Sequence, residues 1–254
     1  MKLTILTDDT HGKCPGEHGF SILIENKILF DVSASDIFIK NSDRLGINLD
    51  NIEYIVLSHG HWDHTNGLKF IKNKKLICHP SCFDKKFRKK DNFYGGMPIS
   101  LEETKQQFDL ILTKEPYKIS ENITFLGEIP RENDFESKTT HFYIEGGEDD
   151  FFLDDSALAI KTDKGLVLIA GCAHAGICNI IEYAKKITRL NTYAVIGGFH
   201  LLKDDKISKK TIEYFKKENI EHIYPGHCVK EPVISEFEKQ LNAKRLHSGD
   251  VIEL

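Results

Sequence analysis

The sequence predicts an α/β protein built as a four-layer αββα sandwich, in which two mixed sheets pack face to face with helices on the outside. Two observations lead to this prediction. Strand patterns dominate the start of each half of the chain, and helical patterns dominate its end. A histidine-rich segment also follows directly after a short apolar strand. In α/β folds the functional residues usually lie at the carboxyl ends of strands. Periodicity alone leaves a single mixed sheet as the alternative.

Length and composition are those of an ordinary soluble domain. The chain has 254 residues, of which 40% are hydrophobic and 29% charged, so we expect one domain spanning residues 1–254. No apolar run is long enough to cross a bilayer and the N-terminus lacks a secretory pattern, so we expect a cytoplasmic protein without membrane contact. The formal charge of -5 argues against a nucleic-acid partner. The scattered cysteines predict reduced thiols rather than a disulfide framework.

The first half of the chain contains apolar, β-branched stretches separated by turn and cap residues. Ser35 is a candidate helix N-cap, and Gly46 is a typical stop residue. In chain order we predict strands at 2–7, 20–25 and 27–31, a helix from Ser35 to Gly46, a strand at 54–57, a helix at 63–72 and a strand at 76–78.

Residues 80–115 are less regular and predict a helical excursion with a loop that covers the active site. Beyond them the alternation resumes. We predict strands near 123–127, 141–145, 156–161 and 166–170, a helix near 175–187, a strand at 192–196, a helix near 207–218, a strand at 221–224 and a final helix near 231–240.

A dense set of metal-binding side chains follows the strand at 54–57. The segment reads HGHWDH over residues 59–64, which places three imidazoles and one carboxylate within six residues. Residues two apart in a loop can project the same way, so His59 and His61 can share one metal ion while Asp63 and His64 turn toward a second. Zn²⁺, Mn²⁺ and Fe²⁺ all accept these ligands. The alternative, a solvated turn, would normally use Asn, Ser and Lys instead.

This segment resembles the His-x-His-x-Asp-His loop of the metallo-β-lactamase superfamily. Residues 19–25 and 28–31 are similar to the two opening strands of that fold. After Asp31 the chain has Val32 and Ser33 where family members usually have Thr-Gly, a difference that affects a turn. The resemblance implies the αββα fold and a two-metal site.

Three later motifs resemble one branch of the superfamily. They are Gly-Cys-Ala-His-Ala-Gly at 171–176, Gly-Gly-Phe-His at 197–200 and Gly-His-Cys at 226–228. This branch holds the metal-dependent hydrolases of superfamily II, often described as similar to the dihydropterin-ribofuranosylaminobenzene-phosphate synthase of methanopterin biosynthesis. The branch usually continues with Thr-Gly, whereas this chain has Val229 and Lys230, so an identical substrate is not implied.

The resemblance also implies ligands in the second half of the chain. His227 corresponds to the histidine that completes the shell of the second metal. After Gly171, where many members have an Asp that bridges both metals, this chain has Cys172, with His174 two residues further on. We expect one of these two to replace the bridge or to supply the third ligand of the first metal, and we favour His174 because a thiolate would make a softer site. A buried thiol is the alternative for Cys172.

Three further positions are candidates with plain alternatives. Asp154 or Asp155 lies where relatives usually carry a histidine, so we expect Asp155 or its neighbour to act as a metal ligand or to support one; a polar turn is the alternative. His200 ends a glycine-containing strand, where it is a candidate catalytic residue or a strand cap. His18, beside Gly19, could project at the rim of the site and contact substrate.

The run at 85–90 gathers five basic residues. We expect Lys85, Lys86 and Arg88 to attract a substrate phosphate. A solvated helix face is the alternative.

Together these features predict a metal-dependent hydrolase with two divalent ions, for which zinc is favoured and manganese or iron are the alternatives. A metal-activated hydroxide would attack a phosphate ester or phosphodiester of a small molecule, and Asp63, His174 and His200 are the catalytic candidates. Two other functions remain open: a pterin-type transferase, in which the metals activate a leaving pyrophosphate, and a metal or ligand sensor without turnover. The sequence predicts no oligomeric state.

Overall fold

The structure is a computed structural model that describes residues 1–254. Contacts divide the chain into two compact units. Unit 1 comprises Met1–Lys114, Thr140–Asp150 and His247–Leu254, and unit 2 comprises Glu115–Thr139 and Phe151–Leu246. The prediction of a single domain over 1–254 stays a prediction.

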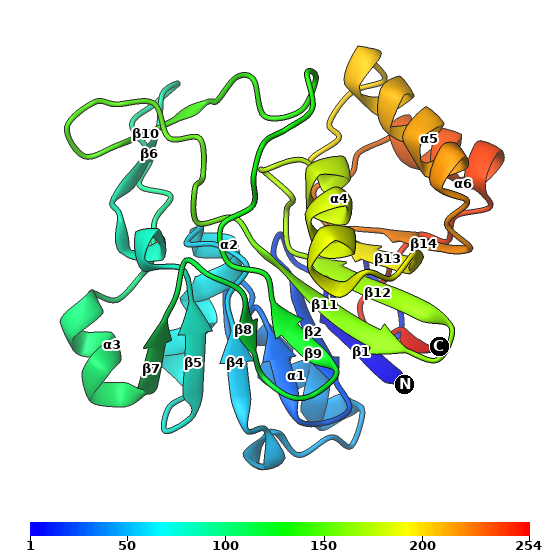
Figure 1. Ribbon diagram of the computed structural model, residues 1–254. Coiled ribbons are helices and arrows are strands. Elements are labelled where there is room, and N and C mark those ends of the chain that lie inside the picture. Colours follow the sequence, from blue (N-terminus) through cyan, green and yellow to red (C-terminus); the bar gives the residue numbers. More distant parts are fainter. The chain divides into compact units, whose positions relative to one another are not determined.

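Unit 1 is organised around a seven-stranded mixed sheet of order β15-β1-β2-β3-β4-β5-β7 (Figure 1). The strands from β15 to β3 pair antiparallel, and those from β3 to β7 pair parallel. Their bounds are β1 (Lys2–Thr7), β2 (Ser21–Ile24), β3 (Ile28–Phe30), β4 (Tyr54–Val56), β5 (Lys75–Cys78), β7 (Asp109–Leu112) and β15 (Val251–Glu253).

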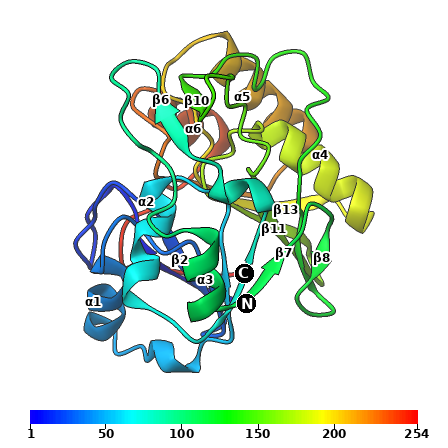
Figure 2. The ribbon, with the colours of Figure 1, turned by 90° about the vertical axis from the view of Figure 1, so that its left-hand side faces the viewer.

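Unit 1 also contains short helices and a small ribbon. The core of this unit includes Phe38 of the first helix together with Leu6, Leu29 and Ile55. The burial of such apolar side chains is the main favourable contribution to folding. The helical segments are α1 (Ile37–Arg44), α2 (Trp62–Thr65), α3 (Leu101–Gln107), η1 (Leu49–Asn51), η2 (Asn66–Phe70) and η3 (Pro80–Phe83). A separate antiparallel ribbon joins β6 (Lys86–Arg88) and β10 (Phe142–Ile144) (Figure 2).

Unit 2 contains a six-stranded mixed sheet of order β14-β13-β12-β11-β9-β8. The β12, β13 and β14 strands run parallel, so their carboxyl ends lie at one edge. The strand bounds are β8 (Tyr117–Lys118), β9 (Ile123–Phe125), β11 (Ala157–Thr162), β12 (Gly165–Ala170), β13 (Thr192–Gly197) and β14 (His222–Pro225). The unit also contains α4 (Ile177–Thr188), α5 (Lys206–Glu218) and α6 (Val233–Leu241).

These three helices pack on the sheet of unit 2 through one apolar face each. The shared core includes Ile180 of α4, Phe215 of α5 and Phe237 of α6, together with Leu168 and Val195 of the strands. Apolar residues three and four positions apart face the sheet in each helix, which is the pattern of an amphipathic helix. None of the helices combines the length and apolar character that a membrane span requires.

Most predicted elements agree with the structure within a few residues, but three expectations need correction. The helix predicted at 63–72 is a single turn of α-helix, α2, followed by the 3₁₀ segment η2. The basic run expected on a helix instead contains the strand β6, because its backbone pairs with the distant β10. Ser35 precedes α1, and its hydroxyl accepts a hydrogen bond from the Ile37 N–H at 3.2 Å, although Asp36 occupies the cap position.

Candidate metal centre

The histidine-rich loop of unit 1 lies between β4 and α2, and its polar side chains are buried. His59 and His64 are fully buried, and His61 and Asp63 are 6% and 5% exposed. The His59 ring centroid lies 4.7 Å from that of His61 and 4.4 Å from that of His64. Since burying polar groups is costly without a partner, three buried imidazoles beside a buried carboxylate favour a cation site.

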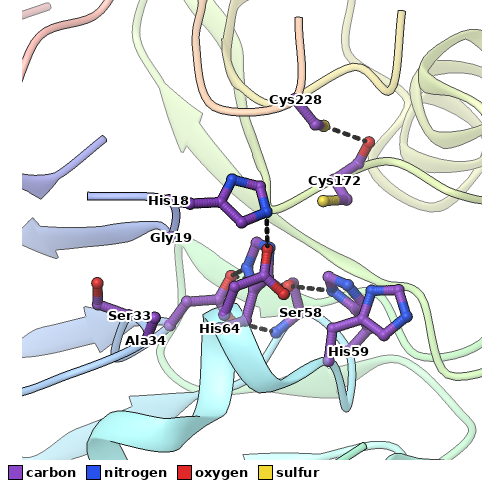
Figure 3. Close-up of polar contacts among 12 residues, drawn as sticks. His18, Gly19, Ser33, Ala34, Ser58, His59, His64, Cys172 and Cys228 are labelled. Carbon is purple, nitrogen blue, oxygen red and sulfur yellow. Dashed lines mark hydrogen bonds and ion pairs between the residues drawn. The ribbon is translucent and has the colours of Figure 1, made fainter. Parts of the chain in front are cut away.

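Asp31, which follows β3, orients two of these rings. Its Oδ2 lies 2.7 Å from His64 Nδ1 and accepts a hydrogen bond from the Ser58 hydroxyl at 2.7 Å, while Oδ1 accepts from the Ser58 N–H at 2.7 Å. The Ser58 Oγ lies 2.9 Å from His59 Nδ1 (Figure 3). Because both Nδ1 atoms are engaged in these contacts, a metal ion would be bound through Nε2 of His59 and of His64. Sequence reasoning had assigned Asp31 only to a strand motif.

Gly60 lets the loop pass close to another backbone segment. A Cβ at this position would lie 2.2 Å from the Cys82 carbonyl oxygen. No side chain fits there, so the residue between the first two histidines is a glycine for steric reasons.

His18 lies beside the loop, and its predicted contact with substrate stays a prediction. Its Nε2 is 3.3 Å from Asp63 Oδ2 (Figure 3). Its Nδ1 is 3.2 Å from Asp9 Oδ2. The neighbouring Glu17 is fixed by the 33–35 turn, whose Ser33 and Ser35 hydroxyls each donate to its carboxylate at 2.7 Å. His18 is 54% exposed, so it can meet both the buried carboxylate and a ligand arriving from solvent.

Unit 2 brings together the candidates of its three branch motifs. The loops after β12, β13 and β14 start at one edge of the sheet because these strands are parallel. One ligand atom from each of Cys172, His174 and His200 lies within 4.8 Å of the others, and the same holds for Cys172, His227 and Cys228.

Contacts within this cluster fix its geometry. The His200 N–H donates to Cys228 Sγ at 3.2 Å, and Cys228 Sγ donates to the Cys172 carbonyl at 3.4 Å (Figure 3). The His174 ring lies 4.4 Å from that of His200 between centroids and stacks on Phe152 at 4.0 Å. His200 and His227 have φ values of 49° and 40°, a strained backbone region that is common at functional sites. Cys228 was not among the predicted site residues, although its position beside His227 was a usable signal.

Asp155 supports the loop that carries His174. Its Oδ2 accepts a hydrogen bond from the Ala175 N–H at 2.9 Å, and burial raises its pKa to about 7. This contact gives the buried carboxylate a structural role in the loop. Its predicted role as a metal ligand stays a prediction.

Three basic residues of the 85–90 run, those expected to bind substrate, are each paired with an acid in unit 1. Lys85 Nζ lies 2.8 Å from a Glu145 oxygen, Lys86 Nζ lies 3.3 Å from an Asp150 oxygen, and Arg88 lies 2.7 Å from an Asp91 oxygen. Lys86 is buried at 1% exposure. These pairs neutralise much of the local positive charge, so the predicted attraction of a phosphate gains no support from charge alone.

The donor sets of both units fit a divalent transition metal. Unit 1 offers imidazole and carboxylate, and unit 2 offers imidazole and thiol, which are the groups that Zn²⁺ accepts. The His64–Asp31 contact of 2.7 Å is the carboxylate–histidine arrangement found behind metal ligands.

Comparison with known proteins agrees with this chemistry. The family model described as metallo-beta-lactamase superfamily matches residues 15–185. The chain belongs to the metallo-beta-lactamase superfamily. At this coarse level it is a metal-binding protein of the metal-dependent hydrolase class.

Solved structures share the fold of this chain. A crystal structure titled as a metal-dependent hydrolase of the beta-lactamase superfamily superposes with a TM-score of 0.91 at 30% identity, covering 100% of this chain and 99% of that one. Zn²⁺-bound PqqB from Methylobacterium extorquens matches with a TM-score of 0.60 at 12% identity over 100% of both chains, a likeness of fold alone. The predicted α/β class with two mixed sheets is therefore confirmed.

Two relatives come from Methanocaldococcus jannaschii. One is an uncharacterized protein, 34% identical over 98% of this chain and 99% of its own length. The other is named 7,8-dihydropterin-6-methyl-4-(beta-D-ribofuranosyl)-aminobenzene-5'-phosphate synthase and is 34% identical over 100% of this chain and 96% of its own length. Membership of the superfamily and the resemblance to this branch are both confirmed.

Proposed function

We propose that this superfamily member is a hydrolase that uses two divalent metal ions, with zinc favoured, to cleave a phosphate ester or phosphodiester of a small molecule. The observation that carries the proposal is the buried, converging set of His59, His61 and His64, with two of its rings oriented by the Asp31 and Ser58 contacts. Contacts of this kind orient the rings of metal-binding histidines and make them stronger ligands. The relative named as a 5'-phosphate synthase supports a phosphorylated substrate.

The protein's own residues hold and orient the reacting groups. In unit 1 we assign His59, His61, Asp63 and His64 as metal ligands. In unit 2 we assign Cys172, His174 and His227 as metal ligands. Bound divalent ions would supply an activated water and a positive charge that stabilises the developing oxyanion. The His18 contact at 3.3 Å fixes one oxygen of Asp63, and burial of these side chains keeps bulk water from competing for them.

The proposal is tested with His59→Ala and Asp63→Ala. Both variants should bind much less metal and lose turnover of phosphodiester and phosphomonoester substrates, because each removes a ligand. Metal content by elemental analysis and initial rates on a panel that also includes lactone and β-lactam substrates give the result. Turnover that persists in a chelator-treated His59→Ala variant would overturn the proposal.

A pterin-type transferase is the second candidate. It is favoured by the full-length similarity to the named synthase. Incubation with labelled dihydropterin pyrophosphate and an aminobenzene partner separates the two functions, because a joined product forms only in the transferase reaction. A joined product without phosphoester hydrolysis would replace the first proposal by the second.

A further inference from the structure

A row of rings leads away from the candidate metal loop within unit 1. The His18 ring, which contacts Asp63, lies 5.8 Å from the Trp62 ring between centroids. Trp62 lies 5.9 Å from Phe93 in an edge-to-face arrangement, and the Arg88 guanidinium lies 5.0 Å from the Phe93 centroid. We call His18, Trp62, Phe93 and Arg88 the aromatic row. Trp62 belongs to the metal loop itself, between His61 and Asp63.

Backbone contacts hold the row in place. The Trp62 N–H donates to the Gly95 carbonyl at 3.0 Å, and the Gly95 N–H donates to the Lys86 carbonyl of β6 at 2.9 Å. The Arg88 N–H donates to the Phe93 carbonyl at 2.9 Å. These bonds tie the 93–95 turn to both the metal loop and the ribbon, so the rings are positioned before any ligand arrives.

A carboxylate locks the outer end of the row. Asp91 accepts two hydrogen bonds from Arg88, at 2.9 and 2.7 Å, and one from the Phe93 N–H at 3.3 Å. The planar guanidinium is thereby held against the Phe93 ring. The hydrogen bonds of Arg88 therefore stabilise the turn, and we do not assign Arg88 to phosphate binding.

The row remains accessible to solvent. Phe93 is 41% exposed, His18 is 54% exposed and Trp62 is half-buried. A single exposed ring is ordinary. Aromatic side chains beside a few convergent polar groups are a common lining of ligand sites. The edge-to-face contact between Trp62 and Phe93 also leaves ring faces that a flat ligand can contact.

We propose that the aromatic row binds a planar ring of the substrate, so that the substrate is a phosphate ester carrying an aromatic or heteroaromatic group. The inference rests on the proposed function, which places the phosphate at the metal loop. A ligand held there would meet Trp62 and then Phe93 within the length of a small molecule, given the ring spacings of 5.8 and 5.9 Å. Stacking on such rings recognises π faces with little preference among them.

Trp62 provides a direct readout because it is the single tryptophan of the chain. Adenosine monophosphate and ribose 5-phosphate form a matched pair of probes that share the sugar and the phosphate and differ in the ring. We expect adenosine monophosphate to quench the tryptophan fluorescence of the zinc-loaded protein saturably and to bind about tenfold more tightly than ribose 5-phosphate. Equal affinity for the two probes would overturn the inference.

Variants at Phe93 assign the effect to the row. Phe93→Leu keeps apolar bulk and should weaken adenosine monophosphate binding about tenfold, while Phe93→Tyr keeps the ring and should bind like the native protein. Phe70→Leu is the matched control, because Phe70 is a 52% exposed ring of unit 1 that is not part of the row. Unchanged binding by Phe93→Leu, or an equal loss in Phe70→Leu, would contradict the assignment.

Failure of this inference can be told apart from failure of the proposed function. If binding depends on the ring but no phosphate ester is hydrolysed, the assignment of the aromatic row holds and the hydrolase proposal is wrong. If alkyl and aryl phosphodiesters of matched leaving-group acidity are hydrolysed at equal rates, the hydrolase proposal holds and the assignment of the aromatic row is wrong.

Discussion

At the scale of single residues, Asp31 connects the strand β3 to the candidate metal centre. It lies outside the histidine motif, yet its carboxylate contacts His64 and Ser58, and Ser58 contacts His59. The carboxylate sets which nitrogen of each ring faces a metal, and its negative charge makes the His64 imidazole a stronger ligand.

Asp31→Asn should therefore lower metal affinity while the fold is kept. The expected loss is about 10- to 100-fold in the zinc dissociation constant, because the amide supplies a weaker acceptor to His64. Competition with a chelating dye measures the zinc dissociation constant. Asp36→Asn is the control, since Asp36 lies on the surface paired with Lys40. Native affinity in Asp31→Asn would show that Asp31 does not tune the ligands.

Gly60→Ala tests the steric argument at the metal loop. The added Cβ would overlap the Cys82 carbonyl at 2.2 Å, so we expect destabilisation of about 1–3 kcal/mol together with weaker metal binding. Gly46→Ala is the contrasting variant, because its Cβ meets no atom within 4 Å and only its φ of 69° carries strain. It should lose stability in thermal unfolding but keep native metal affinity. Equal metal affinities in both variants would refute the role assigned to Gly60.

At the scale of elements, a distant carboxylate caps α4. Gly176 begins this helix without a side-chain cap. Glu136 accepts instead from the Cys178 and Asn179 N–H groups at 3.0 Å each, and from Asn133 at 2.6 Å. A negative group at a helix N-terminus also interacts favourably with the helix dipole. The contact joins the 133–136 turn to the helix that follows the His174 loop.

This cap predicts a pH dependence of stability. Burial raises the pKa of Glu136. Hydrogen bonds from Cys178, Asn133 and Asn179 lower this pKa, but the effect of burial is larger. The folded protein then holds this proton more tightly than the unfolded chain, whose carboxyl titrates near 4.5. The contribution of Glu136 to the free energy of unfolding is therefore complete below this value and declines as pH rises through the folded-state pKa.

Glu136→Gln cannot titrate, so it should lack that decline. Urea unfolding at a series of weakly acidic to neutral pH values measures the slope for the native protein and the variant. Glu132→Gln is the control, because Glu132 is an exposed carboxylate of the same segment, paired with Lys186, and it should keep the native slope. A native slope in Glu136→Gln would exclude Glu136 as its source.

The helices and strands differ in how far the sequence predicts them. Strands such as β1 and β12 and helices such as α4 were predictable, because their apolar periodicity is local. The strands β6 and β15 were not. Each has three residues, and each is stabilised by pairing with a strand that is distant in the chain, β10 and β1 respectively. No local pattern records such a partner.

At the scale of the whole molecule, metal binding should be coupled to folding. Ligands that bind only the folded state raise its stability by about 2.7 kcal/mol at a free concentration of 100 times the dissociation constant. We therefore expect the midpoint of thermal unfolding to rise with zinc and to fall on chelation. His59→Ala should remove most of that rise.

A matched variant makes this test specific. His141→Ala removes an exposed histidine of unit 1 that lies outside the candidate centre, so its zinc-dependent shift should equal that of the native protein. If His59→Ala also keeps the full shift, zinc stabilises the protein from another place and the assignment of the loop is wrong.

The sequence by itself determined the superfamily, the main strands and helices, and the HGHWDH loop as the candidate metal site. It could do so because a motif of adjacent ligands and the periodicity of an element are both local in the chain. Its assignment of individual ligands, including the choice between Cys172 and His174, stays a prediction.

Only the tertiary structure showed that Asp31 and Ser58 stand behind the histidines, that Cys228 joins the cluster of unit 2, and that Lys86 is buried against Asp150. It also revealed the aromatic row that runs from His18 to Arg88. Many of these contacts join residues that are far apart in the chain, as in the 27 positions between Asp31 and Ser58 and the 64 between Lys86 and Asp150. They exist because strand pairing and core packing bring distant segments together, and neither composition nor periodicity encodes which segments will meet.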